Sequence, residues 1–231
     1  MLNSKYLYLT LDLLSFAFPF LFSFYSKANF SKKWKYVWVA ILLPAVLFIA
    51  WDEYFTQLGV WGFNEKYLSG IYIGSLPLEE VLFFICIPYA CVFTYEALNY
   101  LFKKDYLAPY QKIISVILTV STLLLGFINI NKWYTCTTFF GLSVYLLILQ
   151  YILKSTFLSR FYFAYLFILI PFFVVNGILT GTLIDDPVVW YNNTENLAVR
   201  IGTIPVEDIF YGMLLILMNV SIFEWHQKGN N

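Results

Sequence analysis

Charged residues and histidine are scarce in this chain, and each scarcity excludes classes of protein. Only 12% of the 231 residues are charged, whereas a soluble domain usually carries about 25%. The single histidine, His226, excludes a multi-histidine iron centre. The formal net charge is zero, which gives no indication of a nucleic-acid partner.

Cofactor fingerprints are also missing. No Gly-x-Gly-x-x-Gly follows a strand pattern, so neither a flavin nor a nicotinamide is predicted. No aspartate-rich Asp-Asp-x-x-Asp or Asn-Asp-x-x-x-Asp diphosphate motif occurs, which argues against a magnesium-dependent prenyltransferase. The cysteines Cys86, Cys91 and Cys136 lack metal-ligand spacing and are expected to be buried free thiols. We therefore expect no cofactor and no metal ion.

Long apolar runs, by contrast, fill most of the chain. It is 61% hydrophobic and 22% aromatic, with a mean hydropathy of +0.72. A bilayer crossing takes about 20 residues, and seven runs approach that length: Tyr6–Tyr25, Tyr36–Asp52, Leu78–Phe102, Ile113–Ile130, Thr135–Leu153, Phe161–Leu183 and Val206–Trp225. They do not alternate as β-barrel strands do. The sequence predicts an all-α membrane protein with about seven transmembrane helices. The last run holds no lysine for a retinal Schiff base, so a retinal protein is excluded.

Lysine and arginine residues are distributed unequally between the two ends of these runs. Ten lie on one side: Lys27, Lys32, Lys33, Lys35, Lys103, Lys104, Lys112, Lys154, Arg160 and Lys228. Four lie on the other: Lys5, Lys66, Lys132 and Arg200. The richer side is expected to face the cytoplasm, with the N-terminus outside and the C-terminus inside. The first run has no small-residue cleavage site after it and is predicted to be a retained helix.

Two segments of the chain match each other at an offset of 128 residues. Gly74–Val81 (GSLPLEEV) matches Gly202–Ile209 (GTIPVEDI), and Asn64 and Asn192 each precede their proline by thirteen positions. The shift lays the first three runs onto the last three. The prediction is a first three-helix repeat over residues 1–105, a spacer helix within 106–132, and a second repeat over 133–231. One spacer helix makes the two repeats parallel, related by an axis along the membrane normal.

The repeated motif places two adjacent carboxyls at the start of an apolar run, as Glu79-Glu80 and Glu207-Asp208. A proline followed by acids is also what an ordinary helix N-terminus prefers. Capping accounts for one acid per motif, however, and the second lies about 100° further round the helix. Ionisable residues in membrane spans are expensive and usually functional. We therefore interpret all four as functional residues.

Five other residues are candidates for supporting the site. These are Asp12, Asn64, Asn192, Pro77 and Pro205. Asp12 lies at the depth of the motif acids, and the shift of 128 aligns it with Phe140.

Two further sets of acids are assigned structural roles. Glu96 and Glu224, seventeen residues beyond Glu79 and Glu207, are expected to meet water or lysine at the cytoplasmic end. Asp52 and Asp185 or Asp186 close apolar runs and are interpreted as solvated helix ends.

Paired carboxyls in an apolar place suit chemistry that needs only protons. Two neighbouring carboxyls do not both ionise, so one keeps a proton while the other stabilises a cation or accepts a proton. Isomerisation or cyclisation of a polyene has these requirements, with no redox change. The sequence leaves open which carboxyl is the acid and which is the base. It also leaves open whether the surplus aromatic rings form interfacial belts or line a cavity and stabilise a cation.

The Pro-x-Glu-Glu element, its weaker second copy, the tryptophan-containing loops and the twofold three-helix plan resemble the integral-membrane, flavin-independent lycopene cyclases. The resemblance covers essentially the whole chain. It implies the single-chain form, in which the two subunits of the bacterial heterodimer are fused. It implies that lycopene, drawn from the bilayer, is closed to β-rings in carotenoid biosynthesis. It also implies that catalysis rests on Glu79, Glu80, Glu207 and Asp208, where Asp208 departs from the usual second glutamate.

Further expectations concern location and partners. The expected location is a bacterial inner membrane, with lipid, other carotenoid-pathway enzymes or a second copy of the chain as partners. Two alternatives stay open from the residues: a proton-coupled carrier or channel that uses the repeated carboxyls, and a non-catalytic assembly subunit.

Overall fold

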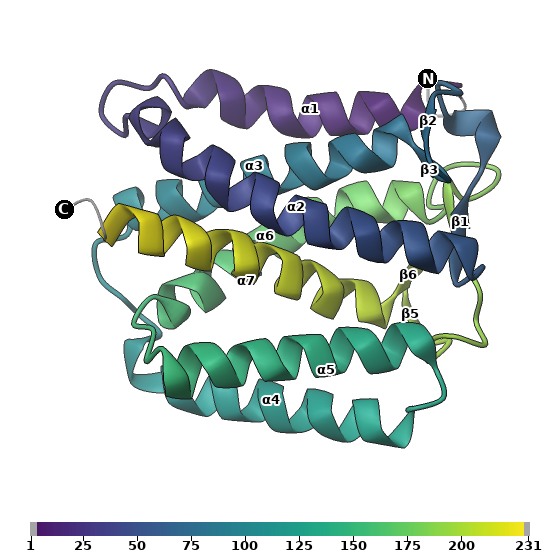
Figure 1. The fold of residues 1–231 in the computed structure, drawn as a ribbon. Coiled ribbons are helices and arrows are strands. Elements are labelled where there is room, and N and C mark those ends of the chain that lie inside the picture. Colours follow the sequence, from purple (N-terminus) through teal and green to yellow (C-terminus); the bar gives the residue numbers. More distant parts are fainter. Residues whose placement is uncertain (1–3, 229–231) are drawn as a thin grey trace.

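The computed structural model describes residues 4–228, in which seven α-helices run side by side (Figure 1). They are α1 (Leu7–Phe22), α2 (Trp34–Gln57), α3 (Leu78–Leu101), α4 (Gln111–Ile128), α5 (Trp133–Leu147), α6 (Leu158–Leu179) and α7 (Val206–Lys228). Short 3₁₀ turns lie at Phe30–Lys33, Glu65–Tyr67 and Ala108–Tyr110, and a π-helical turn at Ile148–Ile152 extends α5. The predicted all-α class and the seven helices are confirmed.

Six of the seven helices in the described residues are long and apolar enough to cross a membrane. The exception is α1, an apolar helix of 16 residues. At 1.5 Å per residue α1 is about 24 Å long, less than the roughly 30 Å of a hydrocarbon core. The helices carry large apolar side chains on their outer surfaces, such as Val46 and Ile128, which are 71% and 76% exposed. Such surfaces fit lipid better than water, so the chain is an integral membrane protein.

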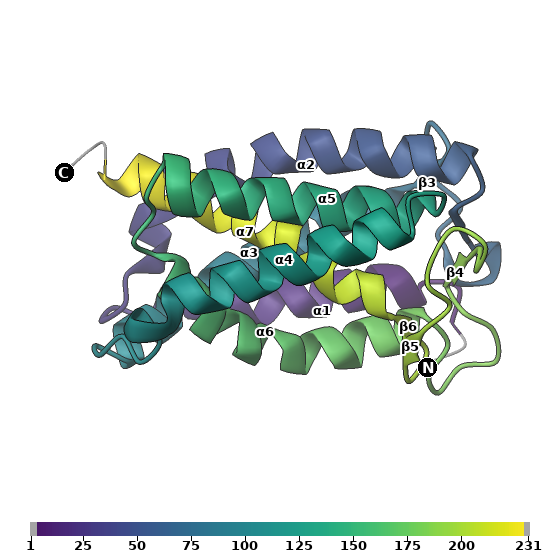
Figure 2. The same ribbon diagram turned by 90° about the horizontal axis from the view of Figure 1, so that it is seen from below.

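The packing of the helices repeats around a central pair, α3 and α7. Helix α1 packs on α3 as α5 packs on α7, while α2 and α6 each contact both central helices. Helix α4 packs against α5, outside this arrangement; it lies at the lower edge of the bundle in Figure 1 and in front of the central helices in Figure 2. This arrangement agrees with two three-helix units and a spacer helix.

A small β-hairpin, which the helical pattern did not predict, leads directly into each acid motif. Strands β2 (Tyr72–Ile73) and β3 (Leu76–Pro77) form one hairpin, and β5 (Arg200–Ile201) and β6 (Ile204–Pro205) form the other. The first residue of each two-residue loop, Gly74 or Gly202, has a φ of 67° or 64°. Glycine adopts that conformation without strain. The helix begins directly after each hairpin, so the acids lie in its first turn.

A third strand pair joins the two halves of the protein. Strand β1 (Trp61–Phe63) pairs antiparallel with β4 (Val189–Tyr191), with Gly62 opposite Trp190. The backbone bonds flanking this pair are themselves equivalent at the 128-residue offset: Asn64 donates to Val188, and Asn192 donates to Val60, both at 2.8 Å. The two tryptophan-containing loops are therefore held against each other around a local twofold axis.

Candidate active site

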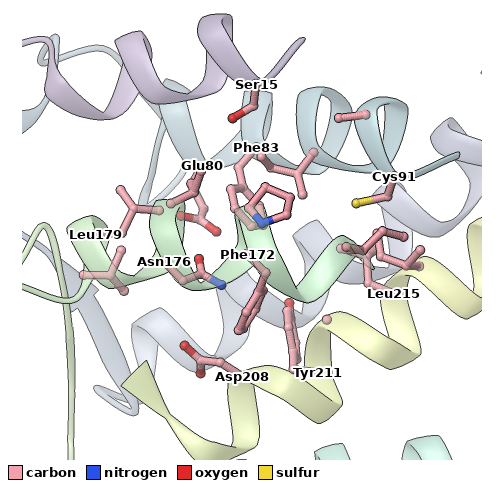
Figure 3. A pocket seen from close by; sticks show the side chains of 18 of the residues that line it. Ser15, Glu80, Phe83, Cys91, Phe172, Asn176, Leu179, Asp208, Tyr211 and Leu215 are labelled. Carbon is pink, nitrogen blue, oxygen red and sulfur yellow. The ribbon is translucent and has the colours of Figure 1, made fainter. Parts of the chain in front are cut away.

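A cavity lies between α1, α3, α6 and α7, at the interface of the two halves (Figure 3). Its volume is about 360 Å³, within the range of small-molecule pockets. Along α3 its lining runs from Glu80 to Thr94, a rise of about 21 Å. The walls are mostly apolar, and the polar groups gather at the end where the hairpins lie. The cavity is therefore an elongated apolar slot with its acids at one end.

The four motif carboxyls are all buried but do not face the same way. Glu80 and Asp208 line the cavity, and Figure 3 shows both side chains directed into it. Glu79 and Glu207 do not line it, and each is 0% exposed. Consecutive helical residues point about 100° apart, so a helix that turns its second acid to the cavity turns its first acid away.

The two outer acids, Glu79 and Glu207, hold the loops that lead into the helices. Oε1 of Glu79 accepts the backbone N–H of Ser69, and Oε1 of Glu207 accepts that of Leu197, both at 2.7 Å. Thr135 also donates its hydroxyl to Oε1 of Glu207 at 2.6 Å. These contacts fit a role in fixing the loops. The catalytic role predicted for these two acids stays a prediction.

Glu80 has two polar neighbours in the first half of the chain. The Tyr8 hydroxyl donates to Oε2 of Glu80 at 2.5 Å, and the Asp52 carboxyl lies close enough to that of Glu80 for the two to interact. Asp52 in turn accepts the indole N–H of Trp61. Oδ2 of Asp52 has no hydrogen-bond donor, so a proton held between the two carboxyls would complete this contact.

Asp208 has different partners. Tyr134 donates to Oδ1 at 2.6 Å, and Tyr191 donates to Oδ2 at 2.9 Å. Removal from water, and then the adjacent Asp208 carboxyl, raise the pKa of the Tyr191 phenol well above its usual value. Tyr191 therefore keeps its proton and remains a donor. A carboxyl that accepts hydroxyl bonds on both oxygens is stabilised in its ionised form.

The contacts of the inner acids also correct one alignment made from the sequence. Tyr8 binds Glu80 as Tyr134 binds Asp208, so the first helices of the two halves correspond at an offset of 126, not 128. The edge-to-face contacts Tyr8–Phe83 and Tyr134–Tyr211 agree with this register. Asp12 lies one turn beyond Tyr8, and its counterpart is Thr138 instead of Phe140. The shift of two residues comes from loop lengths that the motif match does not record.

Asp12, a candidate for site support, is buried at 0% exposure but does not line the cavity. Both of its carboxyl oxygens lack a hydrogen-bond partner, as does Oε2 of Glu79. The Glu79 carboxyl lies close enough to Asp12 to repel a negative charge on it. Asp12 therefore lies outside the cavity, near the outer acid Glu79. Its support role stays a prediction.

The remaining support candidates shape the loops. The side chains of Asn64 and Asn192 accept backbone N–H bonds from residues two positions on, Lys66 and Thr194, at 3.1 Å each. Pro77 ends β3 immediately before α3, and Pro205 ends β6 immediately before α7. None of these four residues lines the cavity.

The interpretation of Asp52 as a solvated helix end is wrong. Asp52 is 2% exposed and lines the cavity, because α2 continues to Gln57 and carries Asp52 into the bundle. Asp185 and Asp186 are solvated as expected, with side chains 66% and 61% exposed and paired with Lys66, but they lie in the loop beyond α6, which ends at Leu179.

The acids at the opposite end of the bundle have structural partners, as expected. Glu96 forms an ion pair with Lys33 at 2.7 Å. Glu224 accepts the Tyr95 hydroxyl at 2.6 Å and lies 4.0 Å from Lys228.

Aromatic side chains surround the acid end of the cavity. Trp61, Tyr134, Tyr191 and Tyr211 all line it, and their ring centroids lie between 5.1 and 6.3 Å apart where they contact. No motif in the sequence singles out these tyrosines or Tyr8. The only sequence signals for them were the spacing of 126 residues between Tyr8 and Tyr134 and the position of Tyr191 in the loop that matches the first-half loop.

In the described residues, the position equivalent to part of the cavity wall is filled by a side chain on the other side of the twofold axis. Gly212 lines the cavity, and its counterpart at the 128-residue offset is Phe84, which is 1% exposed. Phe84 packs against Phe48 with ring centroids 6.2 Å apart. A phenyl ring thus stands in the core of the first half where the second half has no side chain.

Within residues 4–228 no group of three or more histidine, cysteine, aspartate or glutamate side chains could hold a metal ion. Cys86 and Cys91 are buried free thiols, as predicted, while Cys136 is half-buried.

Comparison with known proteins identifies the family. A family model described as lycopene cyclase matches residues 5–98 and 131–226, two segments that correspond to the three-helix units and leave out α4. A bifunctional lycopene cyclase/phytoene synthase from Phycomyces blakesleeanus is 39% identical over 64 residues, which are 27% of this chain and 10% of that protein. The chain thus spans a small part of this relative. No solved structure matches significantly. With most of its length matched by the family model, the chain belongs to the lycopene cyclase family.

Proposed function

We propose that this protein cyclises the end group of lycopene, or of a closely related linear polyene, in carotenoid biosynthesis. The observation that carries the proposal is the facing of Glu80 and Asp208 into one apolar slot. Proton donation and proton removal are the two operations that cyclisation needs, and a buried carboxyl can perform either. The family membership supplies the substrate class.

The proposed reaction conserves protons and electrons. A carboxyl gives a proton to C2 of the terminal double bond, which leaves a tertiary cation at C1. The C5–C6 double bond attacks C1, so a C1–C6 bond forms and the positive charge moves to C5. A carboxylate then removes the proton from C6, and C5=C6 forms to give a β-ring. One proton enters, one leaves, and no electron is transferred.

The aromatic rings at the acid end support this chemistry. A cation moving from C1 to C5 would pass close to the rings that line this end of the cavity, those of Trp61, Tyr134, Tyr191 and Tyr211. The negative face of an aromatic ring attracts a cation, and the attraction is strongest away from water. Mostly apolar walls also keep water from capturing the cation.

The cavity offers a route for a substrate dissolved in lipid. Helices α1 and α6 meet near their hairpin ends, where Leu7 and Leu179 share a small core. Further along, both helices line the cavity, and Leu14 and Phe18 of α1 are 65% and 63% exposed. We propose that the polyene passes from the bilayer between α1 and α6.

The dimensions imply one end group at a time. A forty-carbon polyene in extended form is roughly as long as the hydrocarbon core is thick, about 30 Å. Because the acids lie at one end of this cavity, a two-ring product requires release of the substrate and its return in the opposite sense. The one-ring product would then appear transiently.

We propose that the two halves of the chain correspond to the two subunits of heterodimeric, flavin-independent relatives, fused into one protein. The halves are residues 1–105 and 133–231, and the spacer is 106–132. The two separate segments of the family match support this division.

We propose that the hairpin end faces outward and that the C-terminal end faces the cytoplasm of a bacterial inner membrane. The unequal distribution of lysine and arginine between the two ends of the helices supports this orientation.

The test is expression in bacteria that accumulate lycopene. The expected outcome is a shift from red to yellow-orange, with one-ring and then two-ring product by chromatography, and no shift for Glu80→Gln. Purified protein should act without added flavin, nicotinamide or divalent ion. A proton-coupled carrier or an assembly subunit would leave the colour unchanged in the presence of well-folded protein, and that result would refute the proposal.

A further inference from the structure

The two inner acids differ in the chemistry of their partners, although the halves that supply them are equivalent. Glu80 contacts one hydroxyl donor, Tyr8, and one carboxyl, Asp52. Asp208 contacts two hydroxyl donors, Tyr134 and Tyr191. The tyrosines Tyr8 and Tyr134 are equivalent, so the difference lies in the second partner of each acid.

The sequence differs at the positions that supply these second partners. Tyr191 corresponds to Phe63 at the 128-residue offset, and Phe63 has no hydroxyl to give Glu80. Trp61, which donates to Asp52, corresponds to Val189, which has no side-chain donor. The asymmetry is therefore built in part from residues on both strands of the β1–β4 pair, while Asp52 itself lies on α2 and corresponds to Thr180 at the same offset.

These contacts imply different charge states. Two carboxyls in contact in an apolar place do not both ionise, so the Glu80–Asp52 pair retains a proton. Asp52 accepts from both Trp61 and Thr56, whereas Glu80 accepts from Tyr8 alone, and the extra donor favours the negative charge on Asp52 and the proton on Glu80. Asp208 instead accepts a donor on each oxygen, which favours the carboxylate.

We infer that Glu80 is the acid and Asp208 the base of the proposed cyclisation, and that Asp52 and Tyr191 are the positioning residues that fix these roles. This inference rests on the proposed function. Glu80 delivers its proton to C2 at the start of ring closure, and Asp208 takes the proton from C6 at the end. Return of that proton from Asp208 to the Glu80–Asp52 pair restores the site.

Removal of each positioning residue should affect a different step. In Asp52→Asn the amide can still accept from Trp61, but its NH₂ donates to Glu80 and holds Glu80 as a carboxylate. Proton delivery should fall at least tenfold, with the ring type unchanged. In Tyr191→Phe the ring remains but Asp208 loses a donor. Substrate consumption should fall less, while proton loss from C4 or from the C5 methyl group yields ε- or γ-rings beside β-rings.

Matched variants separate these effects from loss of structure. Tyr162→Phe also removes a buried tyrosine hydroxyl bond, to Ser115 at 2.6 Å, and Tyr162 does not line the cavity. Asp105→Asn changes a carboxyl that accepts from Ser159 at 2.6 Å outside the cavity. Both should keep the ring composition and most of the rate. Asp52→Glu, which restores a carboxyl, should recover part of the rate lost in Asp52→Asn.

A measurement without substrate tests the charge states directly. The infrared C=O stretching band of a protonated carboxyl should be weaker in Glu80→Gln and in Asp52→Asn than in the unaltered protein. Asp208→Asn should leave that band unchanged. If the band instead falls in Asp208→Asn and persists in Glu80→Gln, the assignment is wrong. It is equally wrong if Asp52→Asn alters the ring type while Tyr191→Phe alters only the rate. Failure to cyclise lycopene, with the expected infrared pattern, would refute the reaction and leave the acid–base division intact.

Discussion

Gly62 and Trp190 lie directly opposite each other in the β1–β4 pair, and they are also equivalent residues of the two halves, 128 positions apart. When a residue pairs with its own counterpart, the twofold axis that relates the two halves passes between the two residues. The axis therefore passes through this pair, beside the acid end of the cavity. The strands contribute Trp61 on one side and Tyr191 on the other, and each binds one of the cavity acids.

This pair leaves no room for a side chain on Gly62. A Cβ there would lie 2.3 Å from Cζ2 of Trp190. Gly62→Ala should lower the free energy of unfolding by about 1–3 kcal/mol, the usual range for overpacking. In a Trp190→Ala background the same change should cost much less, because the ring is gone. Thermal unfolding of all four proteins in detergent measures the difference, and equal costs in both backgrounds would contradict the pairing.

The four motif acids should separate into two functional classes. Glu80→Gln and Asp208→Asn should each reduce cyclisation by at least about 10²-fold, as expected for loss of an acid or base. Glu79→Gln and Glu207→Gln should retain most activity, because the amide oxygen still accepts the N–H of Ser69 or Leu197. Rates of product formation, normalised to folded protein, provide the measurement. An inactive but normally stable Glu79→Gln protein would show that Glu79 takes part in the reaction.

The volume at Gly212 should control how the substrate fits. A Cβ there would lie 3.4 Å from the Tyr165 hydroxyl and 3.6 Å from Phe172, which is ordinary contact. Gly212→Ala should therefore be tolerated, whereas Gly212→Phe, which copies Phe84 of the other half, should fill the slot and raise KM strongly. Steady-state assays in detergent with both variants decide this, and normal activity of Gly212→Phe would mean that the substrate binds elsewhere.

Blocking the gap between α1 and α6 should slow access from lipid. Ser15 on α1 lines the cavity, and Ser15→Trp should reduce the rate with membrane-embedded substrate. The matched change Ser121→Trp lies on α4, which contributes no residue to the cavity, and should have little effect. The assay uses vesicles preloaded with lycopene. Equal rates for the two variants would exclude this route.

The proposed orientation can be tested with single cysteines in a cysteine-free background. Glu65, near the hairpins, and Lys104, between α3 and α4, are both exposed. In intact cells an impermeant thiol reagent should label Glu65→Cys but not Lys104→Cys, and both should react after lysis. The reverse pattern would invert the topology.

Several features followed from local sequence because they depend on composition and spacing alone. Runs of apolar residues long enough to span a bilayer have few alternatives to a helix, since backbone groups in lipid must bond within their own segment. The matching segments Gly74–Val81 and Gly202–Ile209 predicted the two units because a repeat at a constant offset is also a property of spacing along the chain. The hairpins escaped prediction because each strand has only two residues, too few to show a period of two.

Which acid faces the cavity was decided by tertiary structure. Glu79 and Glu80 are equivalent by sequence pattern, and only the rotation of α3 against its neighbours points Glu80 inward. Asp52 looked like a helix end, but the length of α2 placed it against Glu80. Tyr8 and Tyr134 became partners of the acids through contacts spanning 72 and 74 residues, which no local pattern encodes.

The sequence by itself determined that this chain is a duplicated, helical membrane protein carrying two pairs of acids, because hydropathy and repetition are properties of the chain read in order. Only the tertiary structure decided that the pairs divide into outer acids that hold loops and inner acids that share one cavity. It also decided that Glu80 meets a carboxyl while Asp208 meets two hydroxyls. These outcomes depend on helix rotation, on a strand pair between distant loops and on a filled space at Phe84, and each of these forms only when the two halves pack together.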